Sequence, residues 1–70
     1  MTKPLTVMLN ETPHTLAADT TLAELLAHAG IVPTAVATAI DGEFVPRVAR
    51  DKRVLKSGEH VICVQAIEGG

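Results

Sequence analysis

Aromatic side chains are nearly absent from this chain. Phe44 is the only one, and the sequence contains no Trp and no Tyr. The core of the 70-residue chain must therefore be built from aliphatic side chains. A chain of this length buries only about 60% of its unfolded surface. One small domain is expected, with little room for a deep active-site pocket.

Cysteine is equally scarce, because Cys63 is the only one in the sequence. An intrachain disulfide, the usual support of small secreted domains, is excluded. No segment resembles a signal peptide, and the apolar runs are too short to span a bilayer. We therefore expect a soluble cytoplasmic protein without membrane association. Cys63 falls in an apolar run that predicts a strand, so its thiol is expected to be buried, poorly ionised and inert.

The net charge is −2, and it is unevenly distributed. Five of the six basic residues fall between positions 47 and 56, where only Asp51 opposes them: Arg47, Arg50, Lys52, Arg53 and Lys56. The segment has two interpretations, a basic patch for an acidic partner or a phosphate, and a solvated connection. Nucleic acid is not an expected partner, because the whole chain is acidic and no aromatic residues interleave the basic ones.

The first elements are predicted by alternation and turn residues. Leu5, Val7 and Leu9 alternate with other residues and predict a strand. Residues 10–13 have the composition of a turn, and 14–17 are expected to form the returning strand.

A single helix is predicted at 22–29. Thr21 and Glu24 have the spacing of a capping box. One helical stripe follows, formed by Leu22, Leu25, Leu26 and Ala29. Gly30 can adopt the left-handed conformation that ends a helix, and Pro33 prevents its continuation.

The second half of the chain predicts three more strands. Asp41-Gly42 is a strong hairpin signal between strands at 36–40 and 43–45. Residues 47–56 are expected to be irregular. Val54 and Leu55 are expected to hold that segment against the core. A last strand follows at 60–67, after a turn at residues 57–59.

The predicted fold class is α+β, with the order β-β-α-β-β-β and one main helix packed on one face of a mixed sheet. One helix cannot cover both faces of a sheet. The last strand is apolar on both faces, which places it centrally beside the first strand.

The alternation of the last strand divides its side chains between the two faces of the sheet. Val61 and Cys63 are expected to face the helix. An exposed apolar patch that marks a partner site is expected on the open face, formed by Ile62, Val64, Ala66, Ala39 and Phe44.

The residues do not predict a catalytic centre. The three histidines, His14, His28 and His60, lack zinc-ligand spacing and are interpreted as ordinary surface residues. No serine or threonine belongs to a recognisable set of nucleophile, base and orienting group. We therefore expect no metal site and no enzymatic activity.

The Gly69-Gly70 end is the remaining chemical feature. A terminal carboxylate is unreactive until it is activated, for example by ATP. Two glycines carry no Cβ and can pass through a narrow channel. The last three residues, fully extended, can reach about 10 Å beyond the sheet. The alternative is a frayed tail that happens to be glycine.

Two segments resemble a known family. "AIDGEFVPR" (39–47) and "LKSGEHVICVQAIEGG" (55–70) are similar to the ThiS family of bacterial thiamine sulfur carriers. The resemblance implies a single β-grasp, or ubiquitin-like, domain over residues 1–70 with a flexible Gly-Gly tail.

The resemblance also implies a function. A ThiF-like, E1-like adenylyltransferase uses ATP to adenylate Gly70, while Gly69 gives the tail access. A persulfide sulfur then replaces AMP, and the Gly70 thiocarboxylate donates its sulfur to a ThiG-like thiazole synthase. The carrier binds no cofactor of its own and is expected to be a monomer when free.

Three alternatives remain open at the level of sequence. The chain can be a sulfur carrier for molybdopterin or cysteine synthesis, in which the chemistry at Gly70 is the same. It can be a protein modifier that joins Gly70 to lysines through an amide bond. It can also be an interaction domain whose tail is inert.

Overall fold

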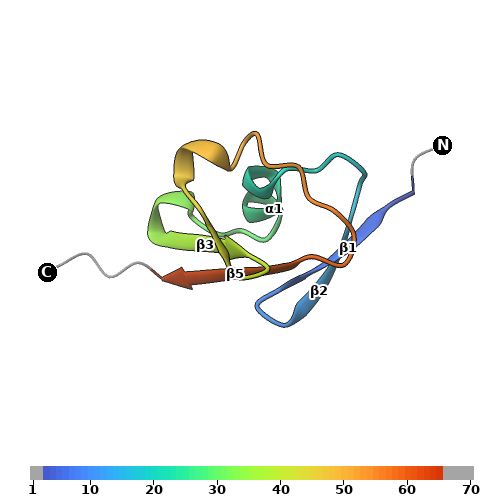
Figure 1. Ribbon diagram of the computed structural model, residues 1–70, viewed down its shortest axis with the longest axis horizontal. Coiled ribbons are helices and arrows are strands. Elements are labelled where there is room, and N and C mark those ends of the chain that lie inside the picture. The colour runs from blue at the N-terminus through green and yellow to red at the C-terminus, as the bar shows by residue number, and fades with distance from the viewer. Residues whose placement is uncertain (1–2, 66–70) are drawn as a thin grey trace, which may run out of the picture.

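The computed structural model describes residues 3–65 of the chain. Over this range it contains a mixed sheet of five strands, one α-helix and two short 3-10 helices (Figure 1). Their order is β1 (Leu5–Leu9), β2 (Thr12–Leu16), α1 (Leu22–His28), η1 (Pro33–Ala35), β3 (Val36–Ile40), β4 (Glu43–Val45), η2 (Arg47–Ala49) and β5 (His60–Gln65). The predicted order β-β-α-β-β-β is confirmed.

The last strand lies at the centre of the sheet, whose strand order is β2-β1-β5-β3-β4. It runs parallel to β1, where Met8 lies opposite His60 and Leu9 opposite Val61. On its other side it runs antiparallel to β3, with Val61 to Gln65 opposite Ile40 to Val36. The prediction of a central last strand beside the first is confirmed.

The first hairpin is tighter than the sequence predicted. Asn10 and Glu11 alone form the turn, with φ values of 47° and 69°. Two consecutive residues with positive φ are typical of the two-residue turns that suit the twist of a hairpin. The returning strand begins at Thr12, so Pro13 lies inside β2 opposite Met8 rather than in the turn. Because β2 is an edge strand, a residue without an N–H group is tolerated there.

Helix α1 begins and ends where the local signals predict. The Glu24 N–H donates to Thr21 Oγ1 at 3.2 Å, and the Thr21 N–H donates to Glu24 Oε1 at 2.9 Å, which completes the capping box. The helix ends at His28, with Ala29 as its C-cap. Gly30 follows with a φ of 75°, a conformation that favours glycine.

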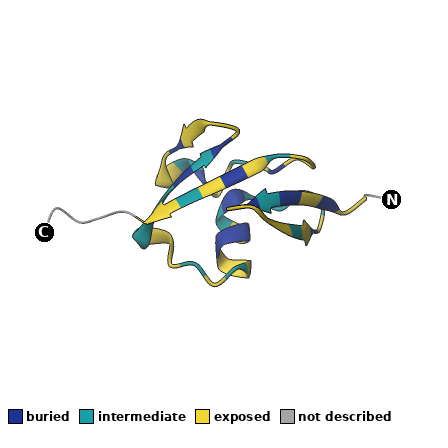
Figure 2. Ribbon diagram, turned by 90° about the horizontal axis from the view of Figure 1, so that it is seen from below, coloured by how far each residue is buried: buried dark blue, intermediate teal, exposed yellow. Residues whose placement is uncertain are grey.

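The core lies between α1 and one face of the sheet, as the burial colours in Figure 2 show. It is aliphatic throughout, and its buried members are Leu5, Val7, Leu9, Leu16, Leu22, Leu25, Ile40, Val45, Leu55 and Val61. The core is therefore filled by many branched aliphatic side chains rather than by a few large aromatic ones.

The segment at 47–56 is anchored by its backbone as well as by its side chains. The Leu22 N–H donates to the Arg53 carbonyl at 2.9 Å, and the Leu55 N–H donates to the Thr20 carbonyl at 2.8 Å. Leu55 is buried, as predicted. The prediction was wrong for Val54, which is 43% exposed because only its backbone bridges to Thr21.

Arg50 is the main correction to the interpretation of 47–56 as a solvated segment, since it is only 4% exposed. Its Nε donates to Thr38 Oγ1 at 3.1 Å, and its Nη2 donates to the Val36 carbonyl at 2.7 Å. Its Nη1 donates to the Pro33 carbonyl at 2.8 Å. The pairing of β4 with β3 reaches only to Thr38, so the guanidinium occupies the edge of β3 that β4 leaves uncovered.

Replacing Arg50 should therefore destabilise the domain. Arg50→Met leaves two carbonyls and a hydroxyl without their donor, and we expect it to lower the free energy of unfolding by about 3 kcal/mol. The measurement is urea denaturation followed by circular dichroism. Lys52→Met, at an exposed position in the same segment, is the matched control and should cost less than about 0.5 kcal/mol. A loss below about 1 kcal/mol for Arg50→Met would contradict a structural role for the guanidinium.

Candidate functional site: an exposed apolar face on the central strand

Strand β5 buries one row of side chains and exposes the other. Val61 is fully buried in the core, whereas Ile62 is 37% exposed and Val64 is 59% exposed. Figure 2 shows this alternation along the strand. Alternation follows from the pleat of the strand, in which successive side chains point to opposite faces. The predicted assignment of faces is confirmed for these residues.

The register brings side chains from three strands together on the open face. Ala39 lies opposite Ile62 of β5 on one side and opposite Phe44 of β4 on the other. Residues directly opposite one another share a face of the sheet. Four of the five predicted docking residues are therefore neighbours, and we call the set Ile62, Val64, Ala39, Phe44 and Ala37 the apolar face.

Sequence reasoning missed Ala37 as a member of the apolar face. It lies opposite Val64 in the register of β3 and β5. Its alternation with Ala39 could have identified it. The predicted Ala66, Gly69 and Gly70 lie outside the described residues.

The apolar face is unusual for a domain of this size. Phe44, the only aromatic residue, is 68% exposed rather than buried in the core. Contiguous exposed apolar side chains on a small domain are typical of a protein-protein contact. The face therefore has the character of a binding surface.

Asn10 extends the pairing of β5 beyond the end of β1. The Cys63 N–H donates to Asn10 Oδ1 at 2.8 Å, and Asn10 Nδ2 donates to the Cys63 carbonyl at 3.1 Å. The side-chain amide thus replaces the backbone of a further strand residue. Sequence reasoning placed Asn10 only in a turn, because nothing local indicates a contact with a residue 53 positions away.

Cys63 faces the core, as predicted, but it is only half-buried. Burial raises the pKa of its thiol, and the positive charge of Arg50 offsets part of that rise. A thiol with a raised pKa is a poor nucleophile near neutral pH. The position favours packing over reactivity, although Cys63 is less buried than the sequence predicted.

Two of the histidines approach one another. The ring centroids of His14 and His28 are 6.0 Å apart, in an edge-to-face arrangement. His60 lies at the start of β5, where its N–H donates to Asp41 Oδ1 at 3.0 Å. Within residues 3–65, no three metal-ligating side chains come together. No helix in that range is long and apolar enough to cross a membrane.

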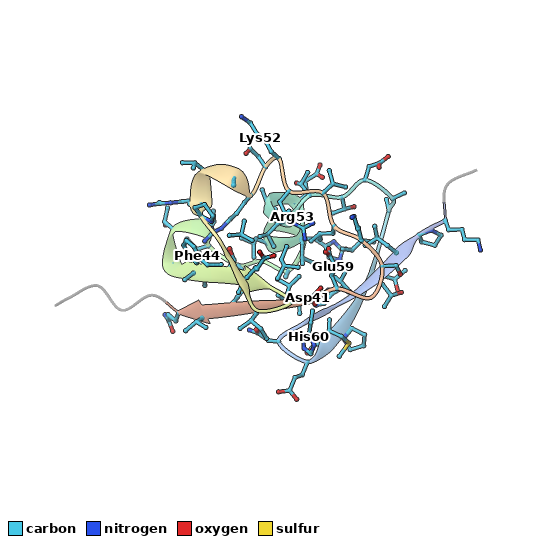
Figure 3. All side chains as sticks on the ribbon, in the orientation of Figure 1. Asp41, Phe44, Lys52, Arg53, Glu59 and His60 are labelled. Carbon is cyan, nitrogen blue, oxygen red and sulfur yellow. The ribbon has the colours of Figure 1, made fainter. Side chains whose placement is uncertain are left out.

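The basic segment presents fewer free charges than its composition suggests. Arg53 Nη2 lies 2.7 Å from Glu59 Oε2, which pairs it with an acid that the sequence analysis did not assign (Figure 3). Arg47, Lys52 and Lys56 are exposed. The exposed positive charges of this segment therefore stand apart from one another and do not form one continuous basic patch.

The described residues thus combine an exposed apolar face with a strand that precedes the Gly69-Gly70 end in the sequence. Comparisons with known proteins agree with this arrangement. The model of the ThiS family matches residues 7–70. A search of curated protein sequences found no match.

A solved structure is also similar. It is the crystal structure of the thiamine biosynthesis protein ThiS from Geobacter metallireducens, with a TM-score of 0.81 and 26% sequence identity. The alignment covers 94% of this chain and 100% of that chain. The fold is therefore the β-grasp fold that the sequence predicted. Since the family model also spans nearly the whole sequence, the chain belongs to the ThiS family.

Proposed function

We propose that this chain is a sulfur carrier protein of thiamine biosynthesis. The observation that carries the proposal is the apolar face on β5, the strand that directly precedes the Gly69-Gly70 end in the sequence. Membership of the ThiS family supports it. The name of the solved relative from Geobacter metallireducens favours thiamine synthesis over the molybdopterin and cysteine pathways.

The chemistry belongs to the carboxylate of Gly70. That carboxylate attacks the α-phosphate of ATP and releases pyrophosphate, which leaves an acyl-adenylate. A persulfide sulfur displaces AMP and forms an acyl disulfide. A second thiol then attacks the donor's sulfur in that acyl disulfide, so that a disulfide forms between the two and the thiocarboxylate leaves. Thiazole synthase takes this sulfur, and the carrier returns to its starting form. ATP is used by the adenylating enzyme, and the carrier binds no cofactor of its own.

The apolar face is the docking surface in this proposal. The adenylating enzyme covers Ile62 and Val64 while the chain beyond Gln65 enters its active site. Gly69 and Gly70 lack a Cβ, so the end of the chain passes where a larger residue would clash. The carrier is then a co-substrate of its partners rather than an enzyme.

The first test of the proposal removes the reacting group. Deleting Gly70 should abolish ATP–pyrophosphate exchange, because the new carboxylate lies one residue, about 3.5 Å, short of the ATP α-phosphate. Gly69→Val keeps the terminal carboxylate but should also fail, since a β-branched side chain stiffens the tail. Melting temperatures should stay unchanged, because a chain terminus contributes little to stability. Exchange at the full rate after the Gly70 deletion refutes the sulfur-carrier function.

A second test addresses the docking surface. Val64→Asp should leave the domain folded, because the Val64 side chain is 59% exposed. It should weaken binding to the adenylating enzyme by at least about tenfold, since a charge would be buried in an apolar interface. Isothermal titration calorimetry measures the affinity. Ala27→Asp, at an exposed position of α1 on the other side of the sheet, is the matched control. Equal affinities for the two variants would exclude this face.

A third test concerns Cys63. Cys63→Ala should still form the thiocarboxylate, because the raised pKa of the half-buried thiol disfavours a role in sulfur transfer. The substitution should cost about 1 kcal/mol of stability, since it removes a small packed group. Intact mass spectrometry after loading measures the first effect and urea denaturation the second. A folded variant that cannot be loaded would assign Cys63 to the chemistry.

A further inference from the structure

A hollow next to the apolar face collects positive charge without any acid to balance it. It has a volume of about 290 Å³. Its polar lining consists of Thr34, Arg47 and Arg50, and its apolar walls include Ala37 and Phe44. We call it the basic hollow.

Arg50 supplies the buried charge of the basic hollow. A guanidinium carries five N–H donors. The three bonds to Thr38, Pro33 and Val36 use one donor on each nitrogen, so one N–H on Nη1 and one on Nη2 remain. In the described part of the chain no carboxylate pairs with Arg50, whose partners are all neutral oxygens. A charge that is 96% buried is poorly screened, so it attracts an anion strongly.

The hollow on the other side of Phe44 differs in this respect. It has a volume of about 350 Å³ and is lined by Lys52 and Arg53, but Glu43 lines it as well. Arg53 is also paired with Glu59 (Figure 3). One of its two cations is therefore paired with an acid, and a carboxylate lies in the lining beside the other. Charge complementarity therefore favours the basic hollow, and the second hollow provides a natural control.

The position of the basic hollow connects it to the docking surface. Ala37, in its wall, lies opposite Val64 on the apolar face. Val36 lies opposite Gln65, the last described residue of β5. A protein that binds to the apolar face can therefore contact the basic hollow at the same time.

We propose that the basic hollow receives the carboxylate of an Asp or Glu side chain on the protein that docks on the apolar face. The carboxylate accepts hydrogen bonds from Arg47, from the remaining N–H donors of Arg50 and from the Thr34 hydroxyl. This inference rests on the proposed function and adds a specific contact to it. The contact selects partners that carry an acid at one fixed place beside an apolar surface.

The occupant is a partner's side chain rather than the phosphates of ATP. Gly70 is five residues beyond Gln65, a distance of up to about 17 Å in an extended chain. The reacting phosphate therefore belongs at the far end of the tail. The apolar walls of the hollow suit a carboxylate delivered on an aliphatic stem, and the net charge of −2 disfavours capture of small free anions.

The test compares how two substitutions that each remove one positive charge change the affinity of the full-length chain for its partner. Arg47→Gln should raise the Kd for the cognate adenylating enzyme by about tenfold at low salt, since a charge-assisted hydrogen bond is lost. Lys52→Gln, in the second hollow, should change the Kd by less than about twofold. The difference should shrink at high salt, because screening weakens the interaction of exposed charges. Both side chains are exposed, so both variants should melt within about 2 °C of the parent chain.

Two further measurements complete the test. In adenylation assays Arg47→Gln should raise KM for the carrier and leave kcat unchanged, because the contact is remote from the reacting carboxylate. Titration of the free chain with inorganic phosphate or acetate, followed by NMR at Thr34, should give no saturable shift below about 10 mM. A saturable shift would make the hollow a site for free anions and overturn the proposal.

The remaining outcomes separate this inference from the proposed function. Equal effects of Arg47→Gln and Lys52→Gln would overturn the basic hollow as a carboxylate site. If the Gly70 deletion still abolishes exchange in that case, the sulfur-carrier function stands without the hollow. If the Gly70 deletion retains exchange, the proposed function fails whatever the Arg47 variant does.

Discussion

One short helix has to cover a five-stranded sheet, and most features of the molecule follow from that constraint. Helix α1 supplies three buried side chains, Leu22, Leu25 and Leu26. They close one face of the sheet and leave the other face open. Because the central strand is apolar on both sides, its second row of side chains, which includes Ile62 and Val64, stays exposed. In the proposed function, stability and partner binding thus use opposite faces of the same strand.

In a sheet with so few large side chains, polar side chains also supply hydrogen bonds to strand backbone that no neighbouring strand pairs. The guanidinium of Arg50 occupies the edge of β3 beyond the reach of β4. The amide of Asn10 continues the pairing of β5 beyond the end of β1. Each replaces missing strand backbone with a planar group of matching donors or acceptors. In this way short strands form a complete sheet within residues 3–65.

Local signals in the sequence predicted the elements, and contacts between distant residues explain what it did not predict. The capping box at Thr21 and the Asp41-Gly42 turn depend on neighbours within a few positions. Arg50 looked like one more solvated cation, because its partners are 12 to 17 residues away. The place of Pro13 depended on knowing that β2 is an edge strand.

The candidate site was predictable to the extent that it follows the pleat of one strand. Alternation alone placed Ile62 and Val64 on the exposed face. The basic hollow was not predictable, because it requires the 3-10 turn at Arg47–Ala49 to bring Arg47 and Arg50 beside β3. Composition showed a cluster of basic residues, but it did not show that Arg53 is paired with Glu59.

Under the proposed function, the central position of β5 explains how a small domain presents a reactive chain end to its partners. The strand is paired with β1 at His60 and Val61 and with β3 from Val61 to Gln65, and in the proposed function the chain beyond it carries the reacting carboxylate. Docking on the side chains of that strand fixes the starting point of the tail relative to the partner. Few residues then separate the docked strand from the reacting end, which limits the entropy cost of binding. In the proposed function, a carrier built in this way leaves the chemistry to its partners and contributes a fixed surface and a fixed length of chain.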